Sequence, residues 1–396
     1  MSLSDLSAIV AKSVMLLVAI SAVVLILTYA ERKALARIQQ RLGPTRVGFG
    51  GILQPVADAL KLLTKEDILP SWADRGVYWI APVAVFLPAF LLWVTIPVAR
   101  DVVVENLDMG LFYITAVSVL SVMGLVMAGW GSANKWAVLG ALRAAGQLVS
   151  YEIPFIMAII GIAMLSQSLN LRTIVDQQNL VPFALLQPLG LFLFLTAGLA
   201  ELGRTPFDIH HAESEVIGGP FIEYSGAHWA IFFLAEYMNT FTIAVLTVLL
   251  FLGGWALPVM PFDGLAHNTL SLLWLLLKTA VVIWVIFWIR GTYPRLRIDQ
   301  LMAFGWKVLV PLSFINIVLT GVVMFYRLPM WSLGVVSALF LVLTFYVIRN
   351  NPGTKISRHT VNVVPAKNLR PPLSDPQFPL LRDKVRGVSS ERSGHQ

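Results

Sequence analysis

The feature that most constrains this chain is a series of long apolar runs without charged residues. Each is close to the ~20 residues that an α-helix needs to cross the hydrocarbon core of a membrane. Eight runs without Asp, Glu, Lys or Arg occupy residues 13–30, 76–99, 109–134, 153–171, 177–200, 237–262, 308–326 and 328–348. A ninth run, 268–289, is interrupted only by Lys278. The sequence therefore predicts a polytopic membrane protein.

The predicted fold is an all-α bundle of about nine transmembrane helices. Within lipid, helices satisfy every backbone hydrogen-bonding group without closing a barrel. We expect one membrane domain over residues 1–349 and a polar, proline-containing cytoplasmic tail over residues 350–396. The first run is too long for the apolar part of a signal peptide and lacks a small-x-small cleavage site, so we expect a retained anchor.

The loop after the first run predicts a helix that lies along the membrane surface. Its apolar and polar side chains alternate with helical spacing, which is typical of an interfacial amphipathic helix. The apolar set is Ile52, Leu53, Val56, Ala59, Leu60 and Leu63, and the polar set is Gln54, Asp58, Lys61 and Lys65.

The distribution of basic residues predicts the orientation of the chain. Short cytoplasmic loops carry an excess of Lys and Arg. One set of alternate loops, 31–75, 131–150, 203–227 and 290–307, holds fifteen basic residues, whereas the other set holds only Arg100, Arg172 and Arg327. We therefore expect the N-terminus outside and the first set in the cytoplasm. The net charge of +7 follows from this bias and from the tail, so it does not indicate nucleic-acid binding.

Residue counts also limit the redox chemistry that this chain can carry. It contains no cysteine, so it cannot hold an iron–sulfur cluster through thiolates. None of its six histidines lies mid-membrane opposite another, as a bis-histidine haem would require. Any electron carrier must therefore belong to a partner.

Ionisable residues in or beside membrane spans are costly, so each is a functional candidate. Four stand out, namely Glu152, Glu201, Glu236 and Lys278. Glu236 and Lys278 could form a structural ion pair between neighbouring helices or take part in a proton relay. Glu152 and Glu201 lie near the expected helix ends, where a carboxylate can also simply face the lipid headgroups.

An acidic segment, residues 200–226, contains five of the twenty-two acids in the chain. They are Glu201, Asp208, Glu213, Glu215 and Glu223. Asp208, His211 and Glu215 would share one face if the segment were helical, but the His-Glu-x-x-His signature of a zinc site is absent, so we predict no metal site. Prolines and glycines favour an irregular segment in which the acids face a hydrated space. Clustered carboxylates raise one another's pKa and can hold protons near neutral pH.

Four ordered blocks are similar to one known family. They read YAERKALARIQQRLGPTRVGFGGILQPVADALKLLTKED, GALRAAGQLVSYEIP, AELGRTPFDIHHAESEVIGGPFIEYSG and RGTYPRLRIDQLMAFGWK, and they cover most of the chain from about Thr28 to about Phe325. They resemble the NADH dehydrogenase subunit 1 family of respiratory complex I, which is the family of the bacterial H subunits.

The resemblance implies a core of eight transmembrane helices, to which this chain adds a ninth span and the tail. It implies a subunit of the proton-translocating NADH:quinone oxidoreductase in the bacterial plasma (inner) membrane. Quinone would be its substrate, and its partners would be the peripheral quinone module, the membrane arm and lipids. The flavin and iron–sulfur clusters would lie in partner subunits.

The resemblance also implies roles for individual residues. Residues that match the wall of the quinone chamber are Glu31, Arg32, Arg41, Asp58, Arg290, Arg295 and Arg297. Residues assigned to an acidic proton-coupling path are Glu152, Glu201, Asp208, Glu213, Glu215 and Glu223, to which we add Glu236 and Lys278. The family pattern Asn-Arg-x-Pro-Phe-Asp-Leu-Pro-Glu is altered here, with Gly203, His210 and His211 in place of Asn, Pro and Glu.

Two alternatives remain at this point. The chain could be the homologous membrane subunit of a related hydrogenase or of a ferredoxin- or F420H2-dependent complex. It could also be a stand-alone proton or cation transporter that uses the same buried acids. The absence of visible internal repeats and the long basic cytoplasmic loops argue against a transporter.

Overall fold

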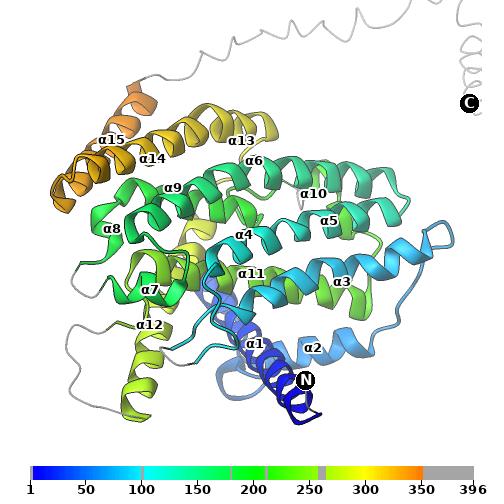
Figure 1. Cartoon of the computed structure of the whole chain (residues 1–396). Coiled ribbons are helices and arrows are strands. Elements are labelled where there is room, and N and C mark those ends of the chain that lie inside the picture. Colours follow the sequence, from blue (N-terminus) through cyan, green and yellow to red (C-terminus); the bar gives the residue numbers. More distant parts are fainter. Residues whose placement is uncertain (1–2, 100–101, 179–180, 210–212, 257–264, 351–396) are drawn as a thin grey trace, which may run out of the picture. The chain divides into compact units, whose positions relative to one another are not determined.

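Every regular element of the described chain is a helix (Figure 1). The computed structural model describes residues 3–99, 102–178, 181–209, 213–256 and 265–350. The α-helices are α1 (Leu3–Ile38), α2 (Gln54–Thr64), α3 (Arg75–Leu91), α4 (Gly110–Ser118), α5 (Leu120–Gly131), α6 (Lys135–Ser166), α7 (Leu171–Asp176), α8 (Phe183–Leu186), α9 (Pro188–Glu201), α10 (Glu213–Val216), α11 (Gly226–Phe251), α12 (Leu265–Thr292), α13 (Ile298–Phe304), α14 (Val310–Phe325) and α15 (Met330–Asn350). Short helical turns occupy Phe49–Gly51, Leu92–Val94, Gly219–Phe221 and Gly305–Leu309.

Eight helical segments are long and apolar enough to cross a membrane, which confirms the predicted all-α polytopic class. The run at 177–200 is the exception, because its helix α9 covers only Pro188–Glu201. Gln187, between α8 and α9, has φ −139° and ψ 61°, which interrupts the helix. Fourteen helical residues reach only ~21 Å, which is shorter than the hydrocarbon core. The predicted tail over residues 350–396 lies almost wholly outside the described residues.

Helix α11 is the central helix of the bundle. Of its membrane-spanning part, 78% is buried within the chain, against 17% for α1. Its side chains are apolar all round, as expected for a helix that is surrounded by others. Helices α1, α2, α3 and α12 all pack against it. Residues on α11 are therefore within reach of groups from both ends of the sequence.

Glycines allow helices α3, α5 and α6 to pack closely. Helices α3, α5 and α6 run side by side (Figure 1). A Cβ at Gly129 of α5 would lie 2.3 Å from the Cβ of Ala141 on α6. A Cβ at Gly124 would lie 2.7 Å from the backbone nitrogen of Val85 on α3. Small residues at such contacts let helix backbones approach within a membrane.

Helix α2 matches the amphipathic helix predicted after the first span. It runs over Gln54–Thr64, and Pro55 begins its first turn. Leu60 and Leu63 are 57% and 65% exposed, so much of its apolar side is not covered by this chain. An exposed apolar side on a short helix suits a membrane surface, and the interfacial location remains a prediction.

The predicted orientation can be tested because the chain has no native cysteine. Lys135 and Asn106 are exposed and lie at opposite ends of the spans that flank them. The excess of basic residues predicts that a Lys135→Cys variant reacts with a membrane-impermeant thiol reagent only from the cytoplasmic side. An Asn106→Cys variant should react only from the outside. Labelling after permeabilisation controls for access, and a reversed pattern at both positions would contradict the orientation.

Candidate functional site

The site is built around Arg204, which follows α9 in the acidic segment. Gln147 of α6 holds this turn, because its Nε2 donates to the backbone oxygens of Ala200 at 2.6 Å and Phe207 at 2.7 Å. Gly203 has φ +62°, which a glycine adopts without strain. The chain therefore turns at the end of α9 and directs Arg204 into the protein, where it is only 4% exposed.

Arg204 joins two carboxylates from different helices, of which Glu31 is buried and Glu236 is partly exposed. Its Nη1 donates to both carboxylate oxygens of Glu31 on α1, each at 3.1 Å. Its Nε lies 3.0 Å from Oε1 of Glu236 on α11. The guanidinium also lies over the ring of Tyr237, 4.4 Å from its centroid. Glu31 is in addition paired with Arg290 of α12. Two arginines and two glutamates thus form one network of zero formal charge, with Arg204 and Glu31 at its buried centre.

The surroundings of Arg204 keep its guanidinium cationic. Burial by itself would lower the pKa of Arg204, but the charges of Glu236 and Asp208 and the contact with Tyr237 outweigh burial and raise it above its ordinary value. A buried charge that has paired, hydrogen-bonded partners is tolerated, whereas an unpaired one is not. Arg204 is therefore a fixed positive charge between Glu31 and Glu236.

Two further ion pairs extend this network toward α2 and α13. Arg32, next to Glu31 on α1, donates to Asp58 of α2 at 2.5 Å. Partial burial would raise the pKa of Asp58, but hydrogen bonds from Arg32 and Gln54 and the nearby positive charges lower it below its ordinary value. Arg295, in the loop before α13, lies 3.0 Å from Asp208. Five of the seven residues predicted for the chamber thus take part in these ion pairs, namely Glu31, Arg32, Asp58, Arg290 and Arg295.

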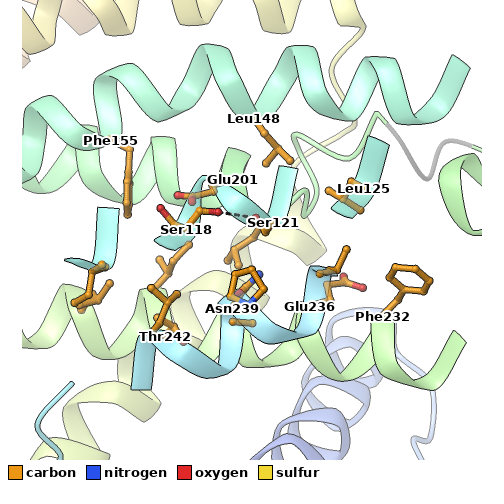
Figure 2. Close-up of a pocket in the computed structure, with 18 of the residues that line it drawn as sticks. Ser118, Ser121, Leu125, Leu148, Phe155, Glu201, Phe232, Glu236, Asn239 and Thr242 are labelled. Atoms are coloured by element: carbon orange, nitrogen blue, oxygen red, sulfur yellow. Dashed lines mark hydrogen bonds between the residues drawn. The ribbon is translucent and has the colours of Figure 1, made fainter. Parts of the chain in front are cut away.

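A cavity lies on the other side of Glu236, between α3, α4, α5, α6, α9 and α11 (Figure 2). Its volume of about 90 Å³ gives room for several water molecules. Glu201 and Glu236 both line it, together with Ser118, Ser121 and Asn239. The two serines flank the break between α4 and α5, and Ser121 Oγ donates to the backbone oxygen of Ser118 at 2.8 Å. The cavity is lined mainly by apolar side chains, with these few polar groups among them.

Glu201 has a second acid close to it. The charges of Glu201 and Glu152 interact across the α6–α9 contact. Oε2 of Glu201 and Oε1 of Glu152 are buried and have no hydrogen-bond partner within the described chain. An unsatisfied buried carboxylate oxygen needs a proton or a water molecule. This pair is therefore suited to hold a proton.

The remaining predicted residues lie farther out. Glu215 is exposed and pairs with Arg143 of α6 at 2.5 Å. Glu223 accepts a hydrogen bond from Nδ2 of Asn134 at 2.7 Å. Glu213 begins α10, and its side chain lies outside the described residues. The Arg41 side chain donates to Gln39 Oε1 at 2.7 Å, and Arg297 is exposed at the N-terminus of α13. His210 and His211 lie outside the described residues, and Asp208 precedes α10 in a non-helical stretch.

The pairing of Glu236 with Lys278 is wrong. Glu236 pairs with Arg204 instead. Lys278 Nζ donates to the backbone oxygens of Leu252 at 2.7 Å and Gly254 at 3.0 Å, just beyond the end of α11. The two helices are neighbours as expected, but these carbonyls lie ~24 Å along α11 from Glu236. Lys278 therefore binds the negative end of a helix dipole.

The expected position of Glu152 near a helix end is also wrong. Helix α6 begins at Lys135 and continues through Pro154 to Ser166, so Glu152 lies in its middle. The apolar run at 153–171 marks only the second half of this helix. Headgroup exposure of Glu152 is accordingly not supported, because one of its carboxylate oxygens is buried.

Sequence reasoning missed Arg204, which has the most contacts in the network. A signal was present, since Arg204 is the single basic residue in the acidic segment 200–226. Ser118, Ser121 and Asn239 were missed because uncharged polar residues are common in membrane helices and their spacing gives no indication of a shared cavity.

Comparisons with known proteins agree with the resemblance. A profile of the family described as NADH dehydrogenase matches residues 11–321. The H subunit of NADH-quinone oxidoreductase from Dehalococcoides mccartyi strain CBDB1 is 49% identical over 298 residues, which are 75% of this chain and 82% of that protein. The corresponding H subunit of Anoxybacillus flavithermus is 48% identical over 74% of this chain and 87% of its own length. The H 2 subunit of Rhizobium meliloti is 46% identical over 75% and 91%.

Removal of Arg204 should destabilise the protein strongly. An Arg204→Ala variant removes the cation between Glu31, which keeps only Arg290, and Glu236, which is 29% exposed. We expect a loss of about 3 kcal/mol, the lower end for a broken buried pair, measured as a lower midpoint of thermal unfolding. Glu236→Gln should partly restore stability in the Arg204→Ala background.

The control is the pair Glu236→Gln and Lys278→Met. Because these residues do not touch, their effects on the same midpoint should add. Two results together would contradict the network. The changes in the midpoint would be non-additive for the Glu236 and Lys278 variants, and they would be additive for the Arg204 and Glu236 variants.

Proposed function

Because this chain belongs to the NADH dehydrogenase family that includes the H subunits of NADH-quinone oxidoreductase, we propose that it forms the wall of the quinone chamber and the start of the proton-coupling path. The chain is a membrane subunit of this oxidoreductase and carries no cysteine for a redox centre of its own. Nothing in the structure or the comparisons favours a hydrogenase subunit or a stand-alone transporter.

The chamber side of the network suits a quinone headgroup. Reduction of a quinone adds two electrons, places negative charge on its oxygens and requires two protons. Arg290 and Arg295 are cations that can stabilise this charge. Glu31 and Asp208, which pair with them, hold the guanidinium groups in place. A change in the charge of the quinone would therefore act first on the Arg290–Glu31 and Arg295–Asp208 ion pairs.

The cavity side suits proton transfer. Glu236 and Glu201 line one cavity that has room for several waters, and Glu152 interacts with Glu201. Carboxylates that share such a space exchange protons through water and repel each other when both are ionised. The path we propose runs from Glu236 to Glu201 and Glu152, with Glu213, Glu215 and Glu223 on the cytoplasmic side. Lys278 would have an electrostatic role at the outer end of α11.

The proposed function also implies which partner subunits and which membrane surround this chain. Electrons would reach the chamber from flavin and iron–sulfur clusters in partner subunits, because this chain has no thiolate ligand. The exposed basic loops would face the peripheral quinone module, and apolar helix faces would contact the membrane arm and lipids. We propose a bacterial plasma (inner) membrane with the acidic segment in the cytoplasm.

One observation carries this proposal. Arg204 contacts Glu31, which belongs to the chamber side, and Glu236, which lines the cavity. A single fixed cation is thereby shared between the place where quinone would be reduced and the place where protons would be held. A change of charge at one carboxylate alters the attraction of Arg204 for the other.

The chamber role predicts a selective loss of quinone reduction. Arg290→Ala in assembled complex should lower NADH-to-quinone turnover at least about tenfold, because a charge-stabilising donor is removed. Electron transfer from NADH to a hydrophilic acceptor should stay near the parent value, since it does not use this chain. Arg327→Ala, an exposed arginine in the opposite loop set, is the matched control. Equal loss of both activities would contradict the role.

The cavity role predicts a loss of coupling. A Glu201→Gln variant keeps the size of the side chain but cannot release a proton. We expect assembled complex with this variant to translocate fewer protons per NADH oxidised than the parent, measured by quenching of a pH-sensitive dye in vesicles. The control is Glu105→Gln, an exposed acid that neither lines the cavity nor belongs to the proposed path. An unchanged proton-to-electron ratio for Glu201→Gln would contradict the path.

A further inference from the structure

A histidine and an aspartate connect the end of α2 to the start of α11. Asp67 lies just beyond α2, and its carboxylate contacts Nδ1 of His228 in the first turn of α11. His228 is only 5% exposed. Its ring lies edge-on to Trp79, with centroids 4.3 Å apart, and near Tyr78 at 5.8 Å. An imidazole enclosed by aromatic rings with one acidic partner has a fixed orientation.

Backbone and hydroxyl contacts reinforce this junction. The backbone nitrogen of Ile68 donates to Ser225 Oγ at 3.1 Å, and Ser225 Oγ donates to Asp67 at 3.5 Å. Gly226 has φ +54°, and a Cβ there would lie 3.1 Å from the backbone oxygen of Lys65. Only a glycine permits this close approach without strain. The segment after α2 and the start of α11 are therefore packed tightly together.

The same junction holds Glu223. Tyr78 Oη donates to the backbone oxygen of Glu223 at 3.0 Å. The rings of Tyr78 and Tyr224 are stacked with centroids 4.2 Å apart, and Tyr224 Oη donates to the backbone oxygen of Tyr78 at 3.3 Å. Tyr78, whose ring lies near His228, thus also holds Glu223 and Tyr224 in place.

At its other end, α2 is tied to α1 by the ion pair between Asp58 and Arg32. We propose that the Asp67–His228 contact is a positioning contact that transmits the position of α2 to Glu223. This proposal rests on the proposed function, in which α2 borders the quinone chamber and Glu223 belongs to the acidic path. It gives a second connection between chamber and acids that does not pass through Arg204.

Two substitutions test the contact. His228→Asn keeps an N–H donor near the position of Nδ1, and His228→Leu removes it. In assembled complex, we expect His228→Leu to lower quinone turnover several-fold. His228→Asn, the conservative variant, should retain most of the parental turnover. Electron transfer to a hydrophilic acceptor should be unchanged in both.

The outcomes are decisive for the positioning role. Parental turnover of assembled His228→Leu overturns the positioning contact, and so does a loss in His228→Asn as large as that in His228→Leu. If His228→Leu does not assemble, His228→Asn combined with Asp67→Ala is used in its place. The double variant should lower turnover several-fold relative to His228→Asn alone. If its turnover equals that of His228→Asn, the proposal is overturned.

An internal reference separates this proposal from the proposed function. Asp58→Asn removes the ion pair with Arg32 at the chamber end of α2. If Asp58→Asn lowers quinone turnover but the His228 variants do not, only the positioning contact fails. If Asp58→Asn also leaves turnover unchanged, the placement of α2 beside the chamber fails.

Discussion

The rest of the structure depends on the buried guanidinium of Arg204. It lies between carboxylates of α1 and α11, and Arg290 of α12 adds a second cation on the α1 side. The ends of α1, α11 and α12 that carry these residues are thereby held together by charged contacts as well as by apolar packing. Burying Arg204 and Glu31 is costly, so the arrangement requires their partners, and removing one leaves an uncompensated charge. This requirement explains why the turn after α9 is held so firmly by Gln147.

This interaction also connects the two chemical regions of the site. Glu31 and Arg290 lie on the side where Arg295 and Asp208 meet, and Glu236 opens onto the cavity with Glu201. Glu31 and Glu236 share the one guanidinium of Arg204, so a change of charge at either carboxylate shifts the balance of its contacts. Such a coupling needs no large movement of helices.

The sequence predicted the elements well and the contacts only in part. Apolar runs revealed the spans because lipid forces backbone groups into helices, and the amphipathic spacing revealed α2. The middle position of Glu152 could not be read from a charge-free run, because α6 carries Arg143 and Glu152 before that run begins. The partner of Lys278 depends on where α12 crosses α11. The spacing of residues within one helix cannot predict that crossing point. Arg204 was missed because its segment stands out by its acids, whereas the single base that joins two of the carboxylates gives a much weaker signal.

The most direct test of the central claim is a double-mutant cycle between Glu31 and Glu236, two carboxylates that share Arg204 without contacting each other in the hydrogen bonds and ion pairs described. NADH-to-quinone kcat/KM would be measured in assembled complex for Glu31→Gln, for Glu236→Gln and for the double variant. The account predicts that the effects are not additive and differ by a coupling of at least about 1 kcal/mol, or roughly fivefold in rate. In an Arg204→Lys background, which keeps the charge but loses the fork geometry, the coupling should shrink. Additive effects of Glu31→Gln and Glu236→Gln with Arg204 intact would contradict the claim that this arginine connects the quinone chamber to the acidic path.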